Sequence, residues 1–183
     1  MYKKQVITKD QGRAIVAALV EEFKRAYLAL SPKDRQSYNE TTVRQKFIDH
    51  FFAALGWAIT DDDVQLEYAQ KRDDDSKGRA DYAFGRSAGK SFFVEAKKPY
   101  EPLDTCVRHA LQARLYGYNA DHPVVILTDF EEFSVYLGRG CEPRASDQVN
   151  TALVTTLTCK FTDYQDKWEV IWDAFSRERV MAG

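Results

Sequence analysis

Acidic and basic side chains interrupt two otherwise apolar segments near the middle of the chain. Asp81 lies within R-A-D-Y-A-F, and Glu95 and Lys97 lie within F-F-V-E-A-K. Because side chains alternate between the two faces of a strand, Glu95 and Lys97 share a face. In a hairpin symmetric about Ala88, Asp81 lies opposite Glu95, with Cβ atoms roughly 4.5 to 5.5 Å apart. The spacing therefore predicts one polar site formed by two adjacent strands.

Two facing carboxylates need a compensating charge. Like charges directly opposed in a sheet repel each other, and burial further disfavours their charged forms. A divalent cation removes that cost, and the oxygens of Asp81, Glu95 and the Ala96 carbonyl are hard ligands that suit Mg²⁺, for which Mn²⁺ can substitute. Lys97 would then lie beside an attacking water and a phosphate, where its charge lowers the barrier to in-line displacement. The pattern indicates metal-dependent hydrolysis.

The same residues also fit a purely structural interpretation. Asp81 could pair with Arg79, while Glu95 and Lys97 form the solvated end of a strand. A kinase strand is excluded because no glycine-rich loop precedes this segment and no H-R-D or D-F-G motif follows it. A zinc site is not indicated either, since the cysteines and histidines lack ligand spacing. They are Cys106, Cys141, Cys159, His50, His109 and His122.

Two helical segments precede the strands that carry these residues. The first has apolar residues at helical spacing from about Lys9 to Leu30, and it ends at Ser31-Pro32. The second begins after Asn39, a potential N-cap, and ends at Gly56. Its apolar stripe, which we expect to face a core, consists of Val43, Phe47, Phe51 and Leu55.

Strands and one further helix follow. The predicted elements are strands over Val64–Ala69, Arg79–Gly85 and Ser91–Lys97, a helix over Leu103–Tyr118 with Leu103, Val107, Leu111 and Leu115 on one side, and strands over Val124–Thr128 and Phe133–Leu137. That helix would make a crossover connection, so the sheet is mixed. A loop over Gly138–Asn150, a short strand near Leu153 and a helix holding Trp168 and Phe175 complete the chain. The fold class is α/β or α+β, with a mixed central sheet flanked by helices.

At this point the sequence resembles a known family. The run D-x13-E-x-K follows a helix that ends in A-L-G-W and precedes a helix that carries Gln112-x-x-x-Tyr116. This order is similar to the N-terminal nuclease domain of type I restriction endonuclease R subunits and of fused type II restriction-modification enzymes, within the PD-(D/E)xK class. The resemblance covers roughly Glu40 to Tyr136. One departure is Ala80, which stands where the class name has proline, and R-A-D-Y is an accepted variant in this branch.

The resemblance implies a role for each matching residue. Asp81, Glu95 and Lys97 are the catalytic residues, with Asp81 and Glu95 binding Mg²⁺ and Lys97 assisting the nucleophilic water. Glu40 matches a helical acid that completes the metal site. The family's Gln-x-x-x-Tyr element lies beside the active site and contacts DNA, and here it corresponds to Gln112 and Tyr116.

The residues outside the central motif also have simpler explanations. Glu40 could complement a helix N-terminus and pair with Arg44 at i+4, although its position on the apolar face favours an inward role. Gln112 and Tyr116 could be a simple surface pair at i, i+4. Two basic residues, Lys98 and Arg79, are the candidates for contacts to the DNA backbone.

Composition limits the remaining possibilities. A chain of 183 residues with 44% hydrophobic residues can bury one core, so we expect a single nuclease domain over 1–183, with a helical arm at 1–38, a nuclease core at 39–137 and an extension at 138–183. The net charge of -2 does not attract polyanions. No apolar run reaches membrane-spanning length and no signal-peptide core follows the N-terminus, so we expect a cytoplasmic protein.

The sequence thus predicts a restriction deoxyribonuclease that acts on double-stranded DNA. Because no base-reading motif is present, we expect the chain to be the N-terminal part of a longer protein that has methyltransferase domains, or specificity and translocase domains, in the same polypeptide or complex. Two alternatives remain open. One is a catalytically inactive nuclease-like module for DNA binding or docking, and the other is a DNA-repair or junction nuclease on the same fold.

Overall fold

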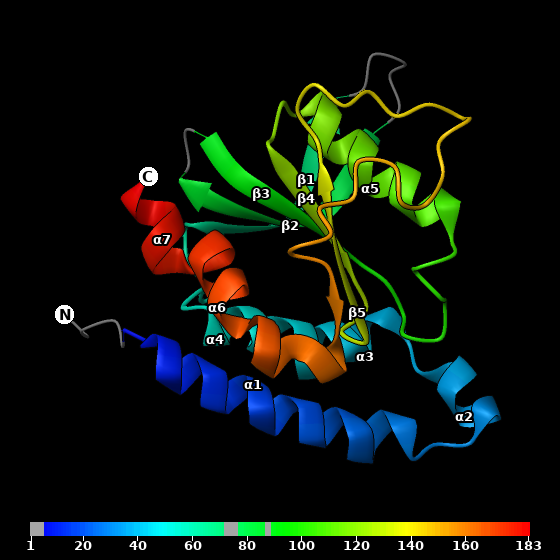
Figure 1. Ribbon diagram of the computed structural model, residues 1–183, viewed down its shortest axis with the longest axis vertical. Helices are drawn as coiled ribbons and strands as arrows, with labels where there is room; N and C mark the ends of the chain where they lie inside the picture. The colour runs from blue at the N-terminus through cyan, green and yellow to red at the C-terminus, as the bar shows by residue number, and fades with distance from the viewer. Residues whose placement is uncertain (1–5, 72–76, 87–88) are drawn as a thin grey trace.

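A mixed sheet forms the centre of the molecule (Figure 1). The computed structural model describes residues 6–71, 77–86 and 89–183. Within these residues the sheet has six strands in the order β1-β2-β3-β4-β5-β6. The strands are β1 (Val64–Lys71), β2 (Lys77–Arg86), β3 (Gly89–Ala96), β4 (Val124–Thr128), β5 (Glu132–Leu137) and β6 (Cys159–Lys160). Neighbouring strands are antiparallel except β3 and β4, which are parallel.

Helices cover both faces of this sheet. They are α1 (Lys9–Phe23), α2 (Pro32–Ser37), α3 (Glu40–Val43), α4 (Asp49–Ala54), α5 (Val107–Asn119), α6 (Tyr164–Phe175) and α7 (Arg177–Ala182), with π-helical turns η1 (Lys24–Leu28) and η2 (Arg44–Ile48) and a 3-10 turn η3 (Phe161–Asp163). Helix α5 makes the crossover between β3 and β4 and lies on the opposite side of the sheet from α1, α4 and α6 (Figure 1). The predicted fold class and crossover are confirmed. No helix in the described part of the chain is long and apolar enough to cross a membrane.

The alternation of side chains along β3 divides the interior into two clusters. Phe92, Val94 and Ala96 pack with α1, α4 and α6 in a large aromatic-rich cluster. Phe93 points the other way and packs under α5 with small residues such as Ala110 and Ala113. Alternation therefore directs Glu95 toward α5, on the face opposite Val94 and Ala96, and this opposition of faces is what the sequence predicted.

The two predicted N-terminal helical segments are confirmed, and the structure shows where they end and how they are capped. Helix α1 continues through η1 to Leu28. Asn39 caps the second segment, because its side chain accepts a hydrogen bond from the Thr42 N–H, and Gly56 ends it with φ +86°. The short helix α2 was not predicted, although Ser31 caps it and Pro32 occupies its first turn.

Helix α5 differs from the prediction in its start and in its buried face. It begins at Val107, after Cys106 in a non-helical conformation, and the Asp104 N–H in the preceding turn donates to the Glu132 carboxylate at 2.8 Å. Its buried residues include Ala110, Ala113, Tyr116 and Gly117, whereas the predicted stripe of Leu111 and Leu115 is partly exposed. Small residues are required here, since a Cβ on Gly117 would lie 3.0 Å from the Gly138 Cα. Close approach of the helix to the sheet therefore overrides apolar periodicity.

The C-terminal segment also departs slightly from the sequence prediction. The strand expected near Leu153 is an isolated bridge to Tyr136, and β6 lies at Cys159–Lys160. Helix α6 buries Trp168, Ile171, Trp172 and Phe175, as its periodicity predicted. Helix α7, which the sequence analysis did not identify, follows directly and is capped by the Ser176 side chain.

Candidate functional site

The pairing of β2 with β3 brings the two central acids together. Tyr82 pairs with Val94 and Ala83 pairs with Phe93, which is the predicted register, and one further step places Asp81 beside Glu95. The register shifts between Phe84 and Gly85, so the symmetry predicted for the hairpin does not extend to its tip. Ala88, the predicted centre of symmetry, lies outside the described residues.

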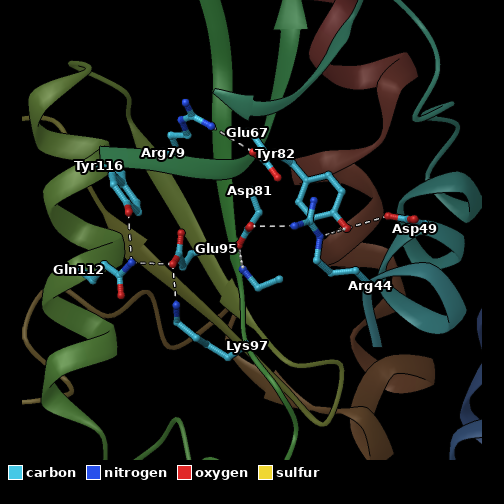
Figure 2. A network of polar contacts seen from close by, with 11 residues as sticks. Arg44, Asp49, Glu67, Arg79, Asp81, Tyr82, Glu95, Lys97, Gln112 and Tyr116 are labelled. Carbon is cyan, nitrogen blue, oxygen red and sulfur yellow. Dashed lines mark hydrogen bonds and ion pairs between the residues drawn. The ribbon is translucent and has the colours of Figure 1, made fainter. Parts of the chain in front are cut away.

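Asp81 is held through both of its carboxylate oxygens (Figure 2). Its Oδ2 accepts the backbone N–H of Ala96 at 2.7 Å, and its Oδ1 pairs with Arg44 Nη1 at 2.9 Å. Burial raises the pKa of Asp81, while the bond from Ala96 and the charge of Arg44 act in the opposite direction. The structural interpretation that paired Asp81 with Arg79 is wrong, because Arg79 pairs with Glu67 at 3.3 Å.

Glu95 is the most deeply buried acid of the predicted set, with a side chain only 5% exposed. Its Oε1 accepts hydrogen bonds from Lys97 Nζ at 2.6 Å and from Gln112 Nε2 at 2.8 Å. Its Oε2 is buried without any hydrogen-bond partner among the described residues. Burial, with repulsion from Asp81 and Glu40, raises the pKa of Glu95 to about 7 against the attraction of Lys97.

Lys97 lies at the end of β3, against Glu95. Burial acts to lower the pKa of its ammonium group, but the Glu95 carboxylate outweighs burial, so the pKa is raised overall. Lys97 therefore carries a positive charge at neutral pH. The interpretation of Glu95 and Lys97 as a solvated strand end is wrong, since the Lys97 side chain is only 13% exposed.

Glu40, at the start of α3, interacts electrostatically with the other residues of the site. Burial and the charge of Asp81 raise its pKa, and the charges of Lys97 and Arg44 lower it. The alternative interpretation of Glu40 is correct in part: Glu40 lies in the first turn of α3, but Arg44 forms its ion pair with Asp81 and only attracts Glu40 electrostatically. Glu40 thus lies within electrostatic range of the Asp81 and Lys97 side chains.

Gln112 and Tyr116 form the α5 wall of the site (Figure 2). The Gln112 side-chain amide donates to Glu95 Oε1 and lies 3.1 Å from the Tyr116 hydroxyl oxygen. Tyr116 is only 4% exposed. The alternative of a simple surface pair is therefore wrong.

Two basic residues lie at the edge of this group. Lys98 pairs with Glu101 Oε1 at 3.1 Å and its side chain is 42% exposed. Arg79 is exposed beside Glu67 on β1. Both are accessible, and their contacts with DNA remain predictions.

The sequence analysis missed several residues that contact this site. Arg44 appeared there only as a possible partner of Glu40, because no local pattern relates it to Asp81, which is 37 residues away. The Tyr82 hydroxyl links Arg44 to Asp49. Beyond Lys98, Glu101 is hydrogen-bonded to the buried His109.

The donor set is suited to a divalent cation. Three acids with raised pKa values lie near one another, and one buried carboxylate oxygen of Glu95 has no partner within the described chain. A hard cation is the natural compensation for such oxygens. In residues 6–71, 77–86 and 89–183, no three His, Cys, Asp or Glu side chains are already gathered in a metal-binding arrangement.

Comparisons with known proteins give one related sequence and a related fold. The chain is 32% identical over 155 residues to the type II restriction enzyme and methyltransferase RM.Eco57I from Escherichia coli, a match that covers 80% of this chain and 15% of that protein. No protein-family model matches the chain. The structure of a DrdV–DNA complex aligns with a TM-score of 0.53 and 16% identity over 91% of this chain and 14% of that one. The type IIG restriction endonuclease BpuSI aligns with a TM-score of 0.44 and 12% identity over 98% of this chain and 18% of that one.

The match to RM.Eco57I agrees with the resemblance found in the sequence. The chain spans about 15% of the length of its curated relative, so the match concerns one part of a larger enzyme. The likeness to DrdV supports the fold. The chain is thus homologous to part of a fused type II restriction enzyme and methyltransferase, as the sequence resemblance indicated.

Proposed function

We propose that this domain is a Mg²⁺-dependent endonuclease that hydrolyses phosphodiester bonds of double-stranded DNA in a restriction-modification system. The observation that carries the proposal is the buried Glu95, whose Oε2 has no partner in the described chain and whose Oε1 contacts Lys97. Burial, with the charges of Asp81 and Glu40, raises the pKa of this carboxylate, so gathering these acids costs free energy that a cation would offset. The homology to a restriction enzyme supports the same conclusion.

Each side chain has a role in this proposal. Asp81, Glu95 and Glu40 would hold the cation, for which Mn²⁺ can substitute. When bound, such a cation polarises the phosphate and makes water a stronger nucleophile. Lys97, which keeps its charge beside Glu95, would stabilise negative charge that develops on the phosphate.

The remaining predicted residues would position these groups and the DNA. Gln112 fixes Glu95 Oε1 in place by its hydrogen bond, and the neighbouring Tyr116 supports the Gln112 amide. Lys98 and Arg79 would contact the DNA backbone, which fixes a protein on DNA without reading its sequence. We therefore propose that sequence recognition and methylation belong to other domains of the same polypeptide or complex; the name of the relative gives a methyltransferase for that enzyme.

Plasmid nicking by the purified chain tests the proposal. Nicking should require Mg²⁺ or Mn²⁺, and Asp81→Asn or Lys97→Ala should lower its rate by at least about a hundredfold. Circular dichroism should show that both variants remain folded. Cleavage that persists in both variants would reject this site, and a wild-type chain that binds DNA but never cuts it in Mn²⁺ would indicate an inactive docking module.

A further inference from the structure

We infer that Arg44 is an internal counter-ion of Asp81 that competes with the divalent cation, so that the domain binds its metal more weakly than its acids alone would. This inference rests on the proposed function, because it concerns the same acidic site. Arg44 has no role in the family resemblance described above. We assign this role to Arg44 because of its position beside Asp81 and Tyr82 of β2 and near Asp49 of α4.

The guanidinium of Arg44 is held in place from several directions (Figure 2). Its Nη1 pairs with Asp81 Oδ1 at 2.9 Å, and its Nε donates to the Tyr82 hydroxyl at 3.1 Å. Its central carbon lies 4.7 Å from the centre of the Tyr82 ring, in cation–π contact. The Tyr82 hydroxyl in turn donates to Asp49 Oδ1 at 2.7 Å.

The π-helical turn η2 makes this arrangement possible. Its i to i+5 geometry is visible in the Asp49 N–H, which donates to the Arg44 carbonyl. Residues five apart diverge around an α-helix but lie close together in a π-helical turn, so Arg44 and Asp49 can both reach the single Tyr82 hydroxyl. Such turns occur frequently at functional sites, and this one begins at Arg44.

The two central acids differ in how many of their oxygens are occupied. Glu95 keeps its Oε2 without a partner in the described chain, whereas both oxygens of Asp81 are occupied, Oδ2 by the Ala96 N–H and Oδ1 by Arg44. A cation that approaches Asp81 must therefore share or displace the guanidinium, and it meets a like charge in a half-buried setting where screening is weak. Arg44 thus opposes cation binding at Asp81 and does not oppose it at Glu95 Oε2.

The test is calorimetric titration of the DNA-free chain with MnCl₂ and MgCl₂. Arg44→Met removes the charge, and we expect it to bind the cation about tenfold more tightly than the wild type. Arg44→Lys keeps the charge and should stay close to the wild type. The matched control is Arg25→Met, since Arg25 lies in the other π-helical turn, pairs with Glu22 and is 73% exposed. That control should leave the affinity unchanged.

Thermal unfolding supplies a second readout. Without divalent cations Arg44→Met should melt at a lower temperature than the wild type, because a buried acid loses its partner. Saturating Mg²⁺ should close most of that gap, since a ligand stabilises the state that binds it. If Arg44→Met does not fold, Tyr82→Phe serves instead: it releases Arg44 Nε, and it should increase cation affinity by a smaller factor.

The outcomes separate the two ideas. One outcome is that the wild type binds a cation and Asp81→Asn abolishes this binding, while Arg44→Met binds the cation with equal or lower affinity than the wild type. In that case the competition between Arg44 and the cation is rejected and the proposed function survives. If neither the wild type nor Arg44→Met binds a cation at these acids, the proposed function fails together with the inference.

Discussion

The two faces of the central sheet are built differently. The face covered by α1, α4 and α6 is filled with large aromatic rings, among them Phe23, Phe47 and Trp168. The face under α5 has fewer aromatic rings and several alanines, and its largest buried side chains include Tyr116 and Tyr136. Glu95 and Lys97 lie on the α5 side, where Gln112 bonds to Glu95, whereas Arg44 reaches Asp81 from η2, whose Phe47 belongs to the aromatic cluster.

This difference separates the source of stability from the source of chemistry. Burial of large rings supplies most of the folding free energy available from such an interior, so the aromatic face can support acids on the other face that cost energy to bury. Alanines on α5 bring the helix close enough for Gln112 to bond with Glu95. Changes on the aromatic face should therefore alter stability, and changes beside the site should alter cleavage or its dependence on pH and metal.

The largest effect on stability should come from Phe23→Ala on the aromatic face. The Phe23 ring is fully buried and packs against Tyr27, Phe47, Phe130 and Phe161. Its loss should lower the free energy of unfolding by about 3 to 5 kcal/mol, measured by urea denaturation. Nicking per folded molecule should stay near the wild-type value, and a loss of nicking in a folded variant would contradict the separation of the two faces.

The fold was predictable where periodicity is the main determinant. Local sequence pattern predicts the strands between Val64 and Leu137, the crossover helix and the aromatic stripe of α6. The buried face of α5 was not predictable, because backbone proximity between Gly117 of α5 and Gly138, just after β5, selects small residues over leucines. A contact of that kind has no counterpart in a single segment of sequence.

The candidate site divides in the same way. Asp81, Glu95 and Lys97 could be identified because hairpin register and strand alternation are short-range rules. Arg44 could not be, since its contact with Asp81 depends on how η2 packs against β2. The π-helical turn that aligns Arg44 with Asp49 also leaves the apolar stripe of the helix intact, so periodicity does not reveal it.

The second effect concerns pH in the absence of divalent cations. Burial raises the pKa of Glu95 from 4.5 to about 7. Between these two pH values the folded chain therefore holds a proton on Glu95 that the unfolded chain has released. The Glu95 contribution to the free energy of unfolding should therefore fall as pH rises from 4.5 to about 7, by on the order of 1 to 3 kcal/mol. Urea denaturation of wild type and Glu95→Gln between pH 4 and 8 measures this difference. A difference that does not vary with pH would contradict the raised pKa.

The smallest effect should come from Gln112→Met, which keeps the length of the side chain and removes its amide. Gln112 Nε2 is one of two donors to Glu95 Oε1, and the loss of a hydrogen bond to a charged group should lower the nicking rate by about tenfold. Stability should change little, because the apolar contacts of α5 are retained. Tyr118→Phe is a control on an exposed part of the same helix and should nick normally. If Gln112→Met instead lowered the melting temperature without slowing nicking per folded molecule, Gln112 would belong with the packing residues, and the α5 face would contribute to stability in the same way as the aromatic face.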